Sequence, residues 1–414
     1  MYVAAAGLFG AEILLLKALV AACFVGSALL CLRIARVLEL CRAGAPIVVS
    51  SLLLLCAPAP HALYQPLAAL LLLATLERAL AWLHAPRRCA LLSAALLASL
   101  CFATKQNVGL LALAALLLAV LLVRARLVPA AIATFAAGAG VCLAPVMLSG
   151  AMRAFADYAF QNKQVYVRVA GVAYAAGITS SLQALVFATP PIAVLLSIVA
   201  LCAARATARR TGIVVLGFAL AALASVYPRA DLDHVVHVVP VAMIACWWAA
   251  TQFKLALPIG TARVAAMVIA GVAIALEIAM PALRLWSRGC TLAALPHFHG
   301  MPLARARHDA LQKNVRDLRA AAGDQPAFLL SRHAAFYYLA TGLENPTPFD
   351  YPAATAFGQR GVRDVAHQLA CGRIALVCMD AHWHDALSPV LLEEYVARTL
   401  RAAAATGAGV IYRR

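Results

Sequence analysis

The most informative feature of this sequence is where its hydrophobic positions fall. Between Ala11 and Trp286, apolar residues form blocks about 16 to 28 residues long, the length an α-helix needs to cross a bilayer. Proline lies at several block boundaries, where helices tend to begin or end. The pattern predicts an α-helical polytopic membrane protein with about ten transmembrane helices, at 11–36, 45–59, 63–83, 89–104, 108–123, 127–149, 182–203, 212–227, 235–252 and 259–286.

The pattern changes after Arg288, where charged residues, proline and histidine become mixed with apolar ones. The short apolar runs 327–331 and 374–379 are typical of buried strands, and 410–412 is a candidate last strand. Residues 302–322 and 388–405 have helical spacing. We therefore expect a transmembrane domain at 1–286 and a small soluble α/β domain at 287–414.

Composition supports this class. The 414-residue chain is 64% hydrophobic and 12% charged, whereas water-soluble domains carry roughly 25% charged residues. The net charge of +17 would suit nucleic acid, but most basic residues lie in short connections between apolar blocks, as they do in cytoplasmic loops. Because no soluble segment presents a basic face, we expect no nucleic-acid partner.

The basic residues also predict the orientation of the chain. One set of alternate connections holds thirteen lysines and arginines between Arg33 and Arg263, and the other set holds seven between Lys105 and Arg288. Cytoplasmic loops are the ones enriched in lysine and arginine. Ten crossings then place both termini, and the soluble domain, outside the cytoplasm.

Twelve cysteines are present, and nine of them lie in or beside apolar blocks, where they act as small hydrophobes. Cys290, Cys371 and Cys378 fall in the soluble part. A disulfide from Cys290 to one of the other two is an alternative to free thiols if that domain is extracytoplasmic.

The richest polar stretch joins two apolar blocks at the expected outer surface. It contains Tyr227, Arg229, Asp231, Asp233 and His234, and His237 follows shortly after. Arginine recognises phosphate oxygens, and carboxylates act as general bases or hold a divalent ion. The alternative is a solvated loop in which Asp231 or Asp233 caps the next helix.

A second polar stretch, Lys105, Gln106 and Asn107, interrupts two apolar blocks at the same expected surface. A lone lysine there can extend to the membrane interface. Three consecutive polar residues favour the lining of a polar cavity instead. We expect Lys105 and Arg229 to converge on one phosphate group.

Weaker candidates occur elsewhere. They are His61, Tyr64 and Gln65 at a third outer turn, Glu277 inside the last apolar block, and Asp157 and Asn162 in the long connection 150–181. An intramembrane carboxylate is a functional candidate by default, whereas an interfacial tyrosine is more often an anchor.

Two of these stretches resemble a known family. Lys105-Gln106-Asn107-Val108-Gly109 and the turn from Tyr227 to His234 look like motifs of bacterial GT-C-class membrane glycosyltransferases, in particular dolichyl-phosphate-mannose protein mannosyltransferases and lipid A aminoarabinose transferases. The segments Tyr337–Gly342 and Asn345–Pro348 resemble the outer domain of some such proteins. The resemblance covers nearly the whole chain, but its motifs are short.

The resemblance implies a glycosyltransferase of the cell inner membrane and cell envelope. It would move a hexose or pentose from a polyprenyl-phosphate carrier to an acceptor glycan, lipid or protein, with a divalent cation as a candidate cofactor. Asp231, Asp233 and His234 become candidate catalytic residues. The candidate substrate-binding residues are Lys105, Gln106, Asn107, Tyr227, Arg229 and His237.

Two other classes remain open. A transporter or flippase for a lipid-linked or anionic solute would also need a polar cavity, although transporters usually contain internal repeats and none is visible here. A non-catalytic membrane scaffold is the other alternative.

One element of the family pattern is missing. The resemblance implies a first helix and an acidic outer loop, and neither precedes the block 11–36. That block would have to run inward without a signal sequence ahead of it. We therefore expect the chain to be an N-terminally truncated and inactive form, unless Asp231 or Asp233 replaces the missing base.

Overall fold

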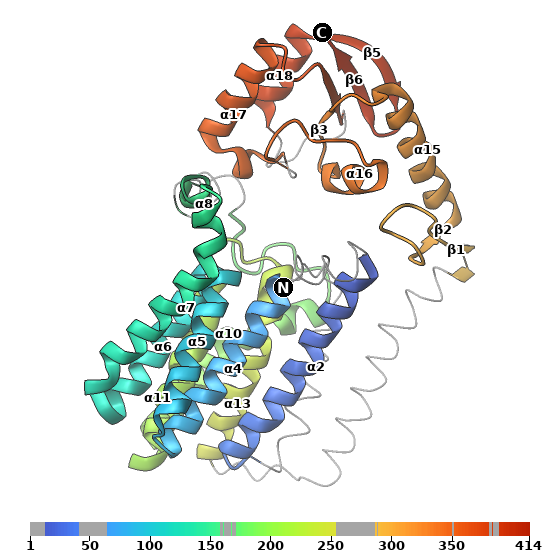
Figure 1. The fold of residues 1–414 in the computed structure, drawn as a ribbon. Coiled ribbons are helices and arrows are strands. Elements are labelled where there is room, and N and C mark those ends of the chain that lie inside the picture. Colours follow the sequence, from blue (N-terminus) through green and yellow to red (C-terminus); the bar gives the residue numbers. More distant parts are fainter. Residues whose placement is uncertain are drawn as a thin grey trace. The chain divides into compact units, whose positions relative to one another are not determined.

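The computed structural model describes residues 13–40, 64–157, 160, 167, 171–253, 286–287, 289–349, 352–380, 383 and 389–414. They belong to two compact units. The helical unit takes its residues from 18–151 and 172–280, and the C-terminal unit takes them from 1–17, 152–171 and 281–414. Figure 1 draws both units, and its colours follow the sequence from blue at the N-terminus to red at the C-terminus.

The helical unit is a bundle of alanine- and leucine-rich helices, residues with high helix propensity. In the described ranges, each helix coincides with one of the apolar blocks (Figure 1). They are α2 (Ile13–Val37), whose first turn belongs to the other unit, α4 (Tyr64–His84), α5 (Arg88–Thr104), α6 (Gln106–Arg124), α7 (Val128–Leu148), α10 (Ser181–Ala203), α11 (Ala206–Ser225) and α13 (Val239–Gln252).

This bundle identifies a multi-pass helical membrane protein. Large apolar side chains such as Val141 (74% exposed) and Leu195 (62% exposed) lie on its surface, where a soluble protein would place polar ones. Six described segments are long and apolar enough to cross a membrane: Ile13–Val37, Tyr64–His84, Gln106–Leu148, Gln183–Ala203, Ala206–Ser225 and Leu232–Gln252.

The described residues do not support the count of ten crossings. Helix α5 has 17 residues, which gives a length of about 26 Å against a hydrocarbon core of about 30 Å. Helices α6 and α7 are joined by the 3-10 turn η1 (Ala125–Leu127) into one apolar segment of 43 residues. The predicted crossings at 45–59 and 259–286 lie outside the described residues.

Glycines allow two helix pairs in this bundle to pack closely. A Cβ atom added to Gly109 of α6 would lie 2.2 Å from the backbone nitrogen of Phe102 in α5. One added to Gly212 of α11 would lie 2.1 Å from the ring of Trp248 in α13. Small residues at such crossings let helix backbones approach each other inside a membrane.

The C-terminal unit is built around a four-stranded sheet in the order β3-β4-β6-β5. The edge strand β3 (Phe328–Leu330) pairs parallel with β4 (Leu376–Met379), and β6 (Gly409–Arg413) pairs antiparallel with both β4 and β5 (Arg401–Thr406). A separate ribbon pairs β1 (Cys290–Leu292) with β2 (Pro302–Ala304).

Helices cover both faces of this sheet. Leu329 belongs to an apolar cluster with residues of α15 (Arg305–Ala322) and α16 (Ala334–Thr341). Its neighbours Phe328 and Leu330 belong to a second cluster, with residues of α17 (Ala354–Ala370) and α18 (Val390–Thr399). Because successive strand side chains point to opposite faces, these clusters make the unit a three-layer α/β structure.

The strands expected at 327–331, 374–379 and 410–412 are confirmed as β3, β4 and β6. The expected helix 388–405 is wrong beyond Thr399, because residues 401–406 pair with β6 as strand β5. The expected helix 302–322 begins three residues late, after β2. Cys290, Cys371 and Cys378 are free thiols, so the disulfide alternative is not realised.

Candidate functional site

The turn between α11 and α12 (Leu232–Val235) is fixed by its backbone. The amide of Val172 donates a hydrogen bond to the carbonyl of Pro228, and the amide of Ala230 donates one to the carbonyl of Val172, both at 3.2 Å. This isolated parallel bridge pairs Val172 with Arg229. The turn is therefore held by a segment more than 50 positions earlier in the chain.

Asp231 is the centre of a charged group on this turn. One carboxylate oxygen accepts a hydrogen bond from Nε of Arg229, and the other lies 2.5 Å from Nδ1 of His234. Burial alone would raise the pKa of Asp231, but the hydrogen bonds from His234 and Arg229 outweigh it, so the pKa lies below the ordinary value. Asp231 is therefore ionised at neutral pH.

An ionised carboxylate determines how the imidazole of His234 is used. Since both oxygens of Asp231 act as acceptors, Nδ1 of His234 must carry the proton that it shares with Asp231. In the neutral ring, Nε2 then keeps its lone pair. A carboxylate that orients a histidine in this way is a recurring device for preparing a general base.

Lys105 lies at the tight junction between α5 and α6, where its backbone is extended (φ −150°, ψ 103°). Its amide donates a hydrogen bond to the carbonyl of Cys101, which ends α5. Two residues later, Nδ2 of Asn107 donates a 2.9 Å hydrogen bond to the carbonyl of Ser225, near the end of α11. The start of α6 is thereby joined to the stretch that leads into the Arg229 turn.

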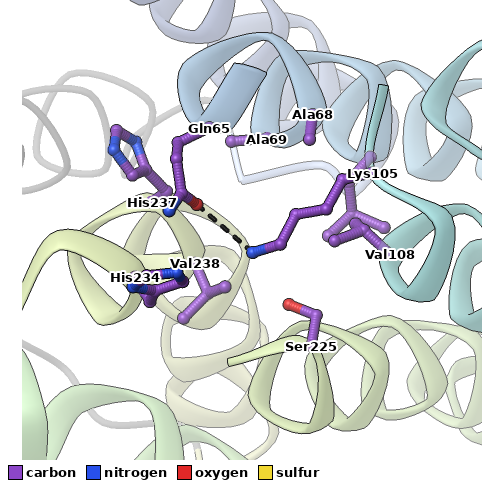
Figure 2. A pocket seen from close by; sticks show the side chains of 10 residues that line it. Gln65, Ala68, Ala69, Lys105, Val108, Ser225, His234, His237 and Val238 are labelled. Carbon is purple, nitrogen blue, oxygen red and sulfur yellow. Dashed lines mark hydrogen bonds between the residues drawn. The ribbon is translucent and has the colours of Figure 1, made fainter. Parts of the chain in front are cut away.

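These elements enclose a pocket. Its empty volume is about 280 Å³, including the part open to solvent. Nζ of Lys105 lies 3.2 Å from Oε1 of Gln65, and Figure 2 shows the lysine side chain extending toward Gln65 and the two histidines. The lining residues come from α4, the α5–α6 junction, α6, α11, α12 and η3 (Val236–Val238): Gln65, Ala68, Ala69, Leu72, Lys105, Val108, Ser225, His234, His237 and Val238.

Three predicted site residues line this pocket: Lys105, His234 and His237. His237 is buried, and its ring stacks on Phe24 of α2 with centroids 6.4 Å apart. Arg229 and Asp231 are not among the lining residues, but they contact His234 directly or through one residue. That Lys105 and Arg229 converge on one phosphate stays a prediction: Lys105 lines the pocket, and Arg229, which is not among the lining residues, contacts Asp231.

The other predicted residues have different positions. Asn107 acts as a link between helices, and Gln106 is not part of the pocket lining. Tyr227 is 67% exposed and Asp233 is also absent from the lining. Asp157 forms an ion pair with Arg360, with 3.7 Å between Oδ2 and Nη1. His61, Asn162 and Glu277 lie outside the described residues.

Gln65 is the residue that the sequence signalled only weakly. It is 5% exposed and supplies the acceptor for the Lys105 ammonium, although it lies 40 positions earlier. A glutamine near the start of an apolar block was the available signal, because a polar group that is buried there needs a hydrogen-bond partner. The partner could not be identified from sequence.

The side chains around the pocket do not fit the divalent cation that the sequence resemblance implied as a cofactor. Both oxygens of Asp231 are engaged by Arg229 and His234. Across the described ranges, no group of three or more histidine, cysteine, aspartate or glutamate side chains could hold a metal ion. We therefore derive no metal-dependent step from this pocket.

Comparison with models of known protein families, with curated proteins and with solved structures finds no match for this chain.

Proposed function

We propose that this protein is a GT-C-like membrane glycosyltransferase that takes a sugar from a polyprenyl-phosphate carrier. One observation carries the proposal: a lysine ammonium and a carboxylate-oriented histidine line the same pocket in a membrane-embedded bundle. A cation can hold the carrier phosphate while the imidazole accepts a proton. The sequence resemblance adds the sugar and the carrier to this chemistry.

The phosphate-binding part of the proposal rests on Lys105. Its ammonium faces the pocket beside Gln65, and it also occupies the N-cap position of α6. The backbone N–H groups at a helix N-terminus favour an anion. Two positive features at one place favour a phosphate oxygen in the pocket.

The catalytic part rests on His234, which we assign as the base in place of Asp231 or Asp233, so the proposal departs from the expectation of an inactive chain. In the proposed step, the acceptor hydroxyl oxygen bonds to the anomeric carbon of the sugar. The bond between that carbon and the phosphate oxygen breaks, and its electron pair leaves with the polyprenyl phosphate. Nε2 of His234 takes the acceptor proton, while Asp231, itself held by Arg229, stabilises the imidazolium.

The proposal also includes the side of the membrane. The basic residues favour the cytoplasm for the opposite ends of these helices, which would open the pocket to the extracytoplasmic surface of the inner membrane. The acceptor, a glycan, lipid or protein, would approach from that surface.

Binding is tested with the full chain in phosphatidylcholine nanodiscs, titrated with polyprenyl monophosphate. Lys105→Ala should weaken binding roughly ten- to hundredfold, the loss expected for one charge-assisted hydrogen bond. Lys313→Ala is the matched control, because Lys313 is exposed on α15 and pairs with Asp317. Equal affinity in wild type and Lys105→Ala would reject the phosphate site.

Turnover is tested with a polyprenyl phosphate carrying a radiolabelled hexose or pentose. His234→Ala should abolish release of the sugar but retain carrier binding within a few-fold, because it removes the base and leaves Lys105. A transporter would instead move the labelled lipid across a proteoliposome without cleaving it. A scaffold would show neither activity.

A further inference from the structure

A second charged cluster lies in the helical unit, away from the pocket. Oε1 of Glu77 in α4 accepts a 2.8 Å hydrogen bond from Nη2 of Arg33 in α2 and a 2.6 Å bond from Nη2 of Arg78. Its other oxygen pairs with Nε of Arg78. The Glu77 side chain is 6% exposed, whereas those of Arg33 and Arg78 are 55% and 32% exposed.

The charges in this cluster do not balance. Two guanidinium groups share one carboxylate, so the cluster carries a net charge of one positive unit. Within the described ranges, Glu77 is the carboxylate that both arginines contact. Arg33 and Arg78 lie near the C-terminal ends of α2 and α4, which are both long and apolar enough to span a membrane, and basic residues at the ends of such helices attract anions. A further anion beside the arginines would balance their charge.

The cluster is separate from the pocket along α4. Gln65 lines the pocket in the first turn, and Glu77 follows 12 residues later, which is about 18 Å along a helix axis. Three further arginines, which are also exposed, lie at the same helix ends. Arg36 is one turn after Arg33, and Arg87 and Arg88 follow the end of α4.

We propose that Arg33 and Arg78, fixed by Glu77, bind the phosphate headgroup of an anionic membrane lipid. A guanidinium presents its N–H donors in a planar fork that matches phosphate oxygens. Glu77 engages Nη2 of Arg33 and Nε and Nη2 of Arg78, so both side chains are oriented before the lipid arrives. Clusters of basic residues at the ends of membrane helices attract anionic headgroups, and a lipid phosphate is present wherever these helices meet the membrane surface.

The test compares lipids on the full chain. The protein is purified in detergent, and binding of phosphatidylglycerol and phosphatidylcholine is measured by native mass spectrometry. Wild type should bind phosphatidylglycerol more tightly. Arg33→Gln brings the cluster to neutrality and should weaken phosphatidylglycerol binding about fivefold per lost cation. Arg209→Gln is the matched control, because Arg209 is an exposed arginine in the first turn of α11.

A second variant distinguishes lipid binding from a purely structural role, in which the ion pair only holds α2 against α4. Glu77→Gln keeps both cations and raises the net charge of the cluster from one to two positive units. The added attraction should offset the lost orientation, so phosphatidylglycerol binding should stay at or above the wild-type level. Equal binding of the two lipids by wild type would overturn the proposal, and this measurement needs no variant to fold. An unchanged affinity in Arg33→Gln, or a loss in Glu77→Gln equal to that in Arg33→Gln, would overturn it as well.

Discussion

Asn107 and Ser225 are 118 residues apart in the sequence, yet the side-chain amide of Asn107 donates a 2.9 Å hydrogen bond to the main-chain carbonyl of Ser225. That carbonyl lies at the last residue of α11, where helical carbonyls lack intrahelical partners. The bond therefore satisfies an acceptor that the helix cannot, and it joins the Lys105 junction to the Arg229 turn.

Removing this bond should destabilise the helical unit. We expect Asn107→Ala to lower the free energy of unfolding by about 1–3 kcal/mol, because a partly buried acceptor loses its donor. The measurement is thermal unfolding of the detergent-purified protein. Gln106→Ala, one position earlier, should cost less, since the described residues give Gln106 no such bond. Equal effects of the two variants would contradict a specific role for Asn107.

Two glycines predict opposite responses to the same substitution. Gly109→Ala places a Cβ atom 2.2 Å from the backbone nitrogen of Phe102, whereas Gly140→Ala meets no atom within 4 Å. Overpacking of this kind typically costs about 1–3 kcal/mol, and the backbone of α5 cannot rotate away as a side chain could. Gly109→Ala should therefore lower the unfolding midpoint, while Gly140→Ala should leave it unchanged or raise it slightly, since alanine favours helix.

The pKa of Asp231 predicts how stability depends on pH. Its folded-state pKa lies below the ordinary value, which for aspartate is about 3.9. The stabilisation from its ionised form is therefore complete above that value and is lost as the pH falls through the lower folded-state pKa. Wild type should be more stable than Asp231→Asn at neutral pH, and the difference should shrink below about pH 4.

The control for this experiment is Asp324→Asn, which removes an exposed carboxylate of the C-terminal unit. Its stability difference from wild type should be small at every pH. A constant difference between wild type and Asp231→Asn down to strongly acidic pH would mean that the carboxylate does not contribute through its charge.

Two cysteines of the C-terminal unit should differ in reactivity. Burial, with a smaller contribution from the charge of Asp380, raises the pKa of Cys378 to about 12. Cys371 is exposed. Because the thiolate is the reactive form, maleimide at pH 8 should label Cys371 in the folded protein and Cys378 only after unfolding. Mass spectrometry of the labelled peptides measures both, and labelling of Cys378 in the folded state would show that it is accessible.

The apolar blocks predicted the helices well because their periodicity and length are local properties. Strand β5 could not be found in this way. Ala402, Ala404 and Ala405 have high helix propensity, but they pair with residues of β6. A contact with another strand decided their conformation, and sequence spacing carries no trace of that partner. The case of α5 is different, because the predicted block 89–104 was already about as short as the 17-residue helix that it forms.

The site was predictable only in part. Lys105 and His234 stood out because charged or titratable residues are rare in such an apolar sequence. Their place in one pocket depends on the bond from Asn107 to Ser225 and on the packing of α6 against α11, which are tertiary contacts. The Asp231 carboxylate could have been a base, a cap or a metal ligand by sequence. Its hydrogen bonds to Arg229 and His234 make it the group that orients the histidine.

The distribution of the pocket along the chain has a consequence for its biogenesis. The ribosome makes Gln65 and Lys105 within 40 positions of each other, but His234 emerges more than a hundred positions later. Domains and segments generally fold in the order of synthesis. Lys105 therefore enters the membrane before the segment that carries His234 and completes the pocket lining. Gln65 already lies in α4, next to the newly inserted α5, and its side-chain carbonyl gives the ammonium a polar partner during that interval. The pair would thus serve the nascent chain before it serves any ligand.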